Sequence, residues 1–389
     1  MITLQILFIL SAYLIIHTYV LFPYILKIIA SSKTQNNLIF ERTDELPRVS
    51  ILLAVYNEEQ VIEQKILSTF NTNYPADKIE FLIGSDASND NTNDIIKSFI
   101  NKYPIKLIEF EGRSGKSGII NKLTELASSD IFIMTDANVF FQEDTIYQLV
   151  KHYKNETIAQ VGGNIINVQY KKDGISFQEK SYLSRENLIK YQEGIIWGTM
   201  IGTFGGCYSI RSNAYGKVPD NFLVDDFYIS MYVLEKGLQS INELNALCVE
   251  DVSNKIEEEF RRKVRISAGN FQNLNRFKGL LWPLYTGLAF SFLSHKVLRW
   301  IGPILLIIAF ISSAILSMQS NYYLYLLLIQ ILVYSTPIID KILKLLSIHI
   351  KSLRFANYLI MMNLALLKGM IWYFKGIKSS VWQPTQRNQ

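Results

Sequence analysis

The two ends of the chain are apolar over lengths that suit a membrane. The first segment runs from Ile2 to Ala30, and no Lys or Arg precedes Lys27. A bilayer core needs about 20 apolar residues in a helix, more than a buried core helix usually supplies. A signal peptide would begin with basic residues. We therefore predict a membrane helix over residues 1–30, and because basic residues follow it, we expect the next domain to be cytoplasmic.

The C-terminal region contains further membrane segments. Ile301–Met318 and Tyr322–Ile339 carry no charge, whereas Ala356–Phe374 contains Asn363 and Lys368. Three spans would place the C-terminus outside, but the basic residues near it favour the inside. Two readings stay open for the last segment: a span, or a re-entrant or interfacial helix.

The predicted divisions follow from these segments. They are a membrane helix over 1–30, a cytoplasmic domain over 47–255, basic amphipathic interface helices over 256–299, a membrane region of two or three spans over 300–377, and a tail over 378–389. The stretch 271–300 mixes aromatic and basic residues, which suits contact with anionic lipid headgroups. A solvated linker helix is the alternative for that stretch.

Composition excludes several classes of protein. Hydrophobic residues make up 49% of the chain and charged residues 19%, so the chain is not disordered. The net charge of +5 (39 basic minus 34 acidic residues) gives no reason to expect nucleic acid as a partner. Cys207 and Cys248 are too few for a disulfide framework or a four-thiolate zinc site. The four His residues are scattered and form no triad or metal motif.

Strand and helix patterns alternate through the first half of the cytoplasmic domain. The expected strands are Val49–Val55, Ile79–Gly84, Lys106–Phe110 and Ile131–Thr135, and the expected helices are Glu58–Phe70, a segment ending at Lys102, and Ile119–Ala127. Such alternation predicts an α/β fold with a mainly parallel sheet. Ligands of such sheets bind at the carboxyl ends of the strands, where Asn57, Asp86 and Asp136 are expected to gather.

Polar residues at these strand ends are the candidate ligand contacts. Asp136 and Asn138, two residues apart, are expected to point the same way and could hold Mg²⁺ or Mn²⁺ against a diphosphate; a turn or helix cap is the alternative. Asp86 is expected to accept a hydrogen bond from a ligand base, and residues 88–90 to form a turn. Lys116 lies in a Gly-rich segment that fails the phosphate-loop spacing. It is either a phosphate-facing charge or a solvated lysine.

Two later segments also carry charge. Asp225 and Asp226 are adjacent carboxylates, whose repulsion suits a general base, although both could simply begin a helix. The basic run from Arg261 to Arg265 offers Arg262 and Arg265 for phosphate oxygens. Attraction of this run to lipid headgroups is the alternative.

Taken in order, these segments resemble the membrane-bound family 2 glycosyltransferases, which include cellulose, hyaluronan and poly-N-acetylglucosamine synthases. The resemblance extends from about Pro47 to Arg299. It rests on Val49–Glu59, Ser85–Ser88, Gly115-Lys116 with Asn121, Asp136–Asn138, Val224–Asp226 and Arg262–Ile266. Gly205-Gly206-Cys207 resembles the acceptor-side turn of the family.

The resemblance implies a GT-A fold that transfers a sugar, with inversion, from a nucleotide-diphosphate donor, expected to be a UDP-sugar. The acceptor would be a glycan or a lipid-linked molecule at the inner face of a bacterial plasma membrane. The implied donor contacts are Tyr56, Asn57, Glu58, Asp86, Lys116, Asp136, Arg262 and Arg265. Asp136 and Asn138 would hold the metal, Asp226 would be the base, and Gly205, Gly206, Cys207 and Asp225 would meet the acceptor.

Three residues depart from the family pattern. Asn138 replaces the second metal Asp, Ser85 replaces a common first Asp, and Ile266 replaces the tryptophan of the polymer synthases. The last departure leaves single transfer open beside polymerisation. Two other classes of function remain as alternatives: a transport or sensing protein that binds nucleotide sugar without catalysis, and a structural membrane scaffold.

Overall fold

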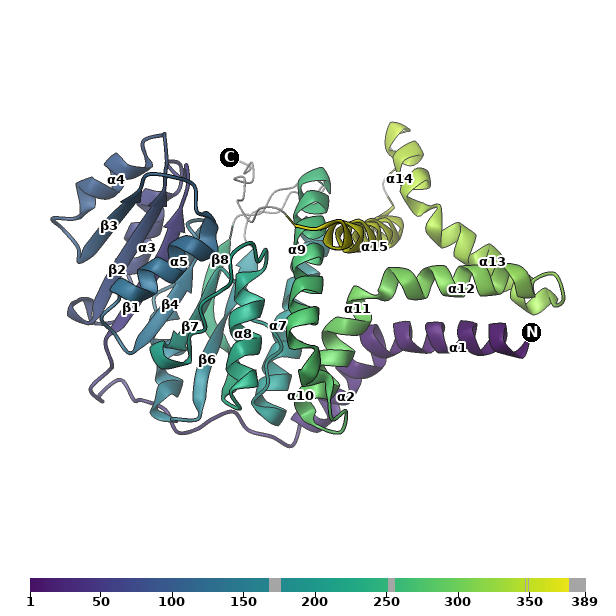
Figure 1. Cartoon of the computed structure of the whole chain (residues 1–389), viewed down its shortest axis with the longest axis horizontal. Helices are drawn as coiled ribbons and strands as arrows, with labels where there is room; N and C mark the ends of the chain where they lie inside the picture. The colour runs from purple at the N-terminus through teal and green to yellow at the C-terminus, as the bar shows by residue number, and fades with distance from the viewer. Residues whose placement is uncertain (168–175, 251–255, 347, 349, 378–389) are drawn as a thin grey trace. The chain divides into compact units, whose positions relative to one another are not determined.

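The computed structural model describes residues 1–167, 176–250, 256–346, 348 and 350–377. The chain forms two compact units, which we treat separately. The helical unit consists of Met1–Ile25, Lys255–Leu281 and Ala289–Gly376. Within the described residues, the sheet unit consists of residues 26–250, Trp282–Leu288 and Ile377. Figure 1 labels the helices and strands of both units.

The described strands of the sheet unit form one mixed sheet. They are β1 (Val49–Val55), β2 (Ile79–Asp86), β3 (Ile105–Phe110), β4 (Ile131–Thr135), β5 (Val139–Phe141), β6 (Ile158–Asn167), β7 (Cys207–Arg211) and β8 (Gln239–Glu250). Their order is β3-β2-β1-β4-β7-β6-β8-β5. Strands β1 to β4 are parallel, β7 runs antiparallel to both β4 and β6, and β8 is parallel to β6. This confirms the predicted α/β class with a mainly parallel sheet.

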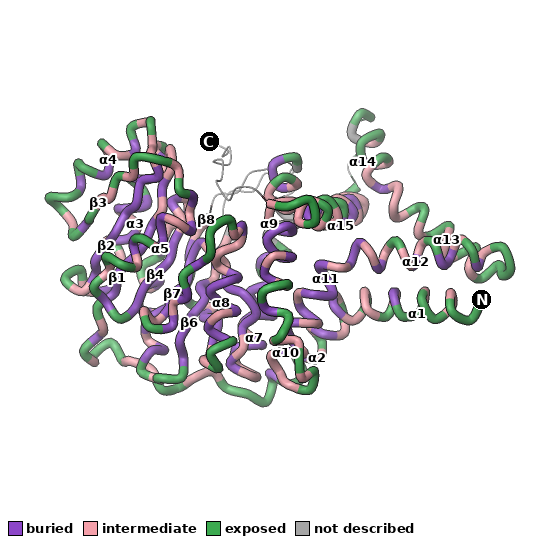
Figure 2. Tube along the Cα trace, viewed as in Figure 1, coloured by how far each residue is buried: buried purple, intermediate pink, exposed green. Residues whose placement is uncertain are grey.

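The core of this unit lies on the two faces of the first strands. Every residue of β2 and β4 is buried, as Figure 2 shows for the sheet. Apolar, often β-branched residues suit such doubly covered strands. The described helices of the unit are α3 (Ile62–Phe70), α4 (Thr92–Phe99), α5 (Gly115–Leu126), α6 (Thr145–Val150), α7 (Ser176–Trp197) and α8 (Asp225–Glu235). Helix α5 packs on β1 and β2.

Two helices begin at other residues than the pattern predicts. Helix α3 starts at Ile62, four residues later than expected, because Asn57 adopts a left-handed backbone conformation (φ 53°) and begins a loop. Helix α5 starts at Gly115, four residues earlier than expected. The Asp86 carboxylate accepts hydrogen bonds from the backbone N–H groups of Ser114 (2.6 Å) and Gly115 (3.1 Å), and so satisfies donors at the start of this helix.

The helical unit contains the apolar segments. Its described helices include α1 (Ile2–Ile16), α9 (Ile256–Phe277), α12 (Gly302–Leu316), α13 (Asn321–Tyr334), α14 (Thr336–Leu345) and α15 (Lys351–Lys375). Helix α1 packs on α12, and α15 packs on α9. Within α15 the Asn363 side chain donates to the carbonyl of Leu359 (2.9 Å), so this polar residue does not interrupt the helix.

Length and composition identify two continuous candidate membrane spans among the described residues, Ile2–Ala30 and Leu353–Lys375. Two bent helix pairs, Gly287–Trp300 with Gly302–Leu316 and Asn321–Tyr334 with Thr336–Leu343, pass the same test when each pair is taken together. The bends are 63° and 47°. The described chain therefore offers between two and four candidate spans.

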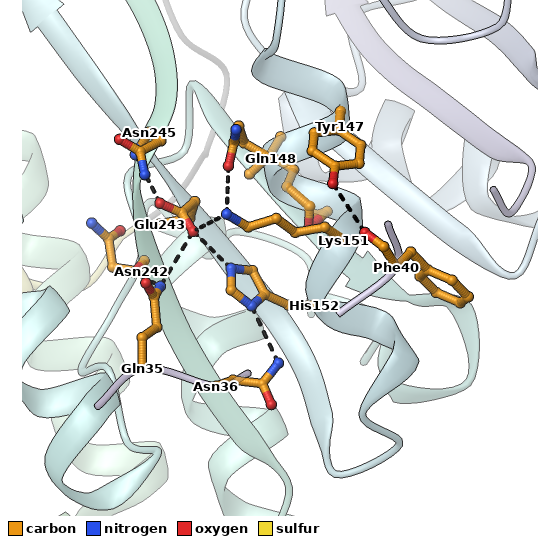
Figure 3. Close-up of polar contacts among 12 residues, drawn as sticks. Gln35, Asn36, Phe40, Tyr147, Gln148, Lys151, His152, Asn242, Glu243 and Asn245 are labelled. Atoms are coloured by element: carbon orange, nitrogen blue, oxygen red, sulfur yellow. Dashed lines mark hydrogen bonds and ion pairs between the residues drawn. The ribbon is translucent and has the colours of Figure 1, made fainter. Parts of the chain in front are cut away.

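A buried polar network holds the segment around Gln35 and Asn36, which follows the first apolar helix, against the rest of the sheet unit (Figure 3). The Glu243 carboxylate accepts hydrogen bonds from His152 Nε2 (2.8 Å) and Gln35 Nε2 (3.3 Å), and pairs with Lys151 Nζ (2.9 Å). Burial alone would raise the pKa of Glu243, but these bonds and the N–H of Asn245 lower it to about 2. The linker after the first apolar segment is thus held by a charged group inside the domain.

Candidate active site

Strand β4 ends at the residue before Asp136, and residues 136–138 form a turn. Asp136 Oδ1 pairs with Lys116 Nζ from α5 at 2.6 Å. Asn138 is not in a strand; its amide donates to Glu250 Oε1 at the end of β8 (3.2 Å). Asp136 and Asn138 thus follow the strand, as expected, and that their side chains point the same way stays a prediction.

Lys116 lies in the field of three carboxylates. Its burial acts to lower the pKa of the ammonium, but the charges of Asp136, Asp225 and Asp226 outweigh that effect and raise the pKa. Lys116 is therefore a permanently charged group at the carboxyl edge of the sheet. Its solvated alternative is wrong, since only 23% of the side chain is exposed and it is ion-paired.

Asp225 and Asp226 begin helix α8. Burial and the adjacent charge of Asp225 raise the pKa of Asp226 to about 6, while Lys116 and Lys190 act in the opposite direction. Asp226 Oδ1 also accepts the N–H of Phe227 (2.8 Å). A carboxylate with a raised pKa takes up a proton more readily than an ordinary Asp, as a general base must.

The Gly205-Gly206 turn lies next to two carboxylates, those of Asp226 and Asp136. A Cβ on Gly205 would lie 2.9 Å from Asp226 Oδ2, and one on Gly206 would lie 3.6 Å from Asp136 Oδ2. The absence of side chains at this turn therefore leaves space beside both carboxylates. The Cys207 side chain is fully buried, with its Sγ 2.8 Å from Cys248 Sγ. Its thiol therefore points into the core, and only its backbone remains for an acceptor contact.

The predicted nucleoside side of the site contains an ion pair. Arg113 Nε donates to Asp86 Oδ2 (3.0 Å), and the Arg113 guanidinium lies 3.3 Å from the centre of the Tyr56 ring. The Asp86 side chain is fully buried. A base that stacks on Tyr56 would meet Arg113 first, and Asp86 positions that arginine.

Asn57 and Glu58 link two loops at the same edge. The Asn57 amide exchanges hydrogen bonds with Asn89 (2.7 and 2.9 Å), and the Glu58 N–H donates to Thr92 Oγ1 (2.8 Å). The Asp90 carboxylate accepts from the N–H of Thr92 (3.0 Å), which confirms the predicted side-chain-capped turn. Here Asn57 and Glu58 hold the loop after β1 against the loop after β2.

Arg262 and Arg265 lie on α9 of the helical unit. The Arg262 guanidinium donates to Glu259 on its own helix (2.9 and 3.4 Å). Their contact with a diphosphate stays a prediction. Of the residues 378–389, assigned to a tail, the structure describes none.

The oxygen ligands available suit a divalent cation that is shared with a substrate. Asp136 offers a carboxylate with 37% of its side chain exposed, and Asn138 offers an amide oxygen next to Glu250. Within the described residues no three His, Cys, Asp or Glu side chains form a metal cage. Mg²⁺ commonly binds through one or two carboxylates and takes its other ligands from phosphates and water. The residues present fit that kind of site.

Sequence reasoning missed three side chains here. Arg113 stands beside Lys116 in the Gly-rich segment, and its pairing with Asp86 appears only in the fold. Glu250 lies at the end of β8, a position of the kind that identified Asp136, but the sequence pattern does not predict that strand. Buried Lys190 on α7 lies 3.3 Å from the centre of the Phe204 ring, beside the acceptor turn.

A mainly parallel sheet with carboxylates and a lysine at its carboxyl edge is the arrangement of a GT-A-type nucleotide-sugar transferase. Residues 50–215 match the family described as Glycosyl transferase family 2. This part of the chain is therefore similar to the family 2 glycosyltransferases. This confirms the resemblance found in the sequence.

Two relatives show the extent of the similarity. A poly-beta-1,6-N-acetyl-D-glucosamine synthase of Staphylococcus epidermidis is 24% identical over 252 residues, which cover 63% of this chain and 59% of the relative. A probable glycosyltransferase, YdaM, of Bacillus subtilis is 33% identical over 123 residues, or 31% of this chain and 29% of the relative. The chain thus spans less than two thirds of the length of these relatives.

One solved structure resembles nearly the whole chain. The mannosyltransferase PcManGT from Pyrobaculum calidifontis, solved with GDP-Man and Mn²⁺, has a TM-score of 0.70 at 20% identity. The match covers 95% of this chain and 99% of that one. At this identity the likeness concerns the fold.

Proposed function

We propose that this enzyme transfers a sugar, with inversion, from a nucleotide-diphosphate donor to a glycan or lipid-linked acceptor at the inner face of the bacterial plasma membrane. The observation that carries the proposal is the grouping of Lys116, Asp136, Asp225 and Asp226 around the Gly205-Gly206 turn. We take a UDP-sugar as the first donor to test, with GDP-sugars as the comparison. Product formation serves cell-surface polysaccharide or glycolipid synthesis.

The donor would lie along the carboxyl edge of β1, β2 and β4. Tyr56 and Arg113 would contact the base, with Asp86, Asn57 and Glu58 supporting the loops around it. Asp136 and Asn138 would hold Mg²⁺ or Mn²⁺, which neutralises the leaving diphosphate when bound. Lys116 would bind phosphate oxygens from the other side, joined by Arg262 and Arg265.

Asp226 would take the proton of the attacking acceptor hydroxyl. Its raised pKa and the small residues in contact with it support this role, since a sugar can approach the backbone at Gly205. Asp225 would contact the acceptor beside it. An in-line attack from this side displaces the diphosphate and inverts the anomeric carbon.

The candidate spans support a membrane location. Lys27 lies near the C-terminal end of the first span and Lys33 follows it, and by the positive-inside rule these charges favour a cytoplasmic location for the next domain. Lipids would also contact the region 256–299, which we propose as interface helices between the catalytic domain (47–255) and the membrane region (300–377).

The test is a donor panel. The full chain, purified in detergent or nanodiscs, is incubated with UDP-sugars and GDP-sugars in Mg²⁺ or Mn²⁺ and membrane lipid extract, and product masses are measured. A ladder of masses indicates polymerisation, and one added sugar indicates single transfer. Nucleotide binding without turnover for any donor would instead support the non-catalytic transport or sensing protein.

A further inference from the structure

A lysine outside the donor and acceptor residues lies fully buried beneath the Asp136 turn. Lys65 of α3 has no exposed surface. Its ammonium donates to Thr135 Oγ1 at 2.7 Å and to the Val139 carbonyl at 2.6 Å. It also lies 3.7 Å from the centre of the Phe141 ring. Two oxygens and an aromatic face thus surround the three N–H donors.

Burying this charge costs stability. Among the described residues no carboxylate forms an ion pair with Lys65, and burial lowers its pKa to about 8 despite the opposing influence of Cys248, Cys207 and Asp136. An apolar side chain of similar volume often stabilises such a site at least as well as a buried charge. What the ammonium offers here, and an apolar side chain would not, is hydrogen bonds that fix the position of its partners.

The contacts of Lys65 show what it positions. Thr135 and Val139 are the residues that flank the turn of Asp136 and Asn138, so one ammonium holds both ends of that turn. The Thr135 hydroxyl in turn donates to the carbonyl of Gly206 (3.0 Å). A continuous hydrogen-bonded chain thus joins α3, the turn of Asp136 and the acceptor-side turn that contacts Asp226.

We propose that Lys65 is a positioning residue that fixes the turn of Asp136 in the conformation that binds a cation and a diphosphate. It also fixes the position of this turn relative to the Gly205-Gly206 turn. The inference rests on the proposed function of Asp136. Lys65 itself does not touch donor or acceptor. It acts through the backbone at Val139 and the hydroxyl of Thr135.

The experiment compares nucleotide binding with and without metal in the full chain. UDP and GDP are titrated into wild-type protein with and without Mn²⁺, and the gain in affinity caused by the cation is the measured quantity. Lys65→Met removes the hydrogen-bond donors and the charge. Thr135→Val removes the hydroxyl that links Lys65 to the Gly206 carbonyl. Lys151→Met is the matched control, because Lys151 is another largely buried lysine of the sheet unit, paired with Glu243. Thermal unfolding is recorded for each variant.

We expect Lys65→Met and Thr135→Val to reduce the cation-dependent gain about tenfold or more, with metal-free binding unchanged within about twofold, and turnover to fall by about 10- to 100-fold. Lys151→Met should keep the wild-type gain even if it melts at lower temperature. Should Lys65→Met fail to fold, Thr135→Val carries the test.

An unchanged cation-dependent gain in folded Lys65→Met or Thr135→Val would overturn the positioning role and leave Lys65 as a structural residue. If wild-type protein shows no gain with Mn²⁺, the proposed cation role fails first, and the wild-type titration alone reveals it. The two failures are therefore distinguishable.

Discussion

The Lys116 ammonium lies 2.6 Å from the Asp136 carboxylate, at the sheet edge where we propose that a cation and a diphosphate bind. In the proposed complex, Asp136 would hold the cation, and Lys116 would then be available to contact a phosphate oxygen. Both the cation and the Lys116 ammonium would stabilise negative charge that develops on the leaving diphosphate.

Removing the Lys116 charge should weaken donor use strongly. We expect Lys116→Met to lower kcat/KM for the donor about 100-fold, because a charge-assisted phosphate contact is lost at a largely buried position. Lys122→Met is the control on the same helix, since Lys122 is exposed and pairs with Glu125. Initial rates over a range of donor concentrations measure the effect. Equal losses in both variants would contradict a specific role for Lys116.

The activity should fall on the acid side of about pH 6. Asp226 must be deprotonated to accept a proton, and its pKa is raised to about 6 by burial and by Asp225. Lys116, Lys190 and Tyr208 also face this group electrostatically. A pH profile of kcat/KM should decline tenfold per pH unit below that value. An acid limb near pH 4, where an ordinary Asp titrates, would contradict the assigned environment.

The raised pKa of Asp226 should also affect the stability of the folded protein. Between pH 3.8 and about 6 the folded state binds more protons at Asp226 than the unfolded state does, so this group lowers stability as pH rises through that window. At pH 7.5 we expect Asp226→Asn to stabilise the protein by about 1–2 kcal/mol, less than the full shift implies because Asp226 is half-buried. Denaturant unfolding measures the difference, and a clear loss of stability would argue against a strained carboxylate.

A methyl group at Gly205 should displace Asp226, the proposed base. In Gly205→Ala the added Cβ would approach Asp226 Oδ2 to 2.9 Å, closer than Cβ atoms normally come to a neighbouring atom. We expect turnover to fall about 100-fold with donor binding retained. Gly279→Ala is the control, because nothing lies within 4 Å of a Cβ there. Normal turnover in Gly205→Ala would show that the turn does not determine the position of Asp226.

The Glu243 network should give the domain acid-sensitive stability. Because the pKa of Glu243 is lowered from 4.5 to about 2, its contribution is complete above pH 4.5 and is lost as pH falls toward 2. Glu243→Gln should destabilise the protein by about 3 kcal/mol at pH 7. Exposed Glu63→Gln should have little effect. Thermal melts at pH 7 and pH 4 compare the variants, and equal melting temperatures for both at pH 7 would contradict the anchoring role.

Features of the fold that depend on the local pattern of residues were predicted from the sequence. Strands β1 and β4 match their predicted bounds, because uninterrupted apolar runs leave little choice of conformation. The gathering of Asn57, Asp86 and Asp136 at one sheet edge followed from strand–helix alternation. The start of α5 was missed, because the carboxylate that caps it comes from a strand 28 residues earlier.

Side chains whose role depends on tertiary contacts could not be predicted. Lys65 fits an amphipathic helix as an ordinary polar residue, and only the fold buries it under residues 135–139. Arg113 acquires its role by pairing with Asp86. The contact of the Asn138 amide with Glu250, which lies 112 residues away in sequence, likewise depends on the fold.

The most direct test of the account is Asp226→Asn in the full chain, assayed for nucleotide diphosphate release and for cation-dependent nucleotide binding. We predict that release in the presence of donor, acceptor and Mn²⁺ falls at least about 1,000-fold while binding stays within about twofold of wild type. Turnover at a wild-type rate in this variant would contradict Asp226 as the base and, with it, the proposed mechanism of transfer.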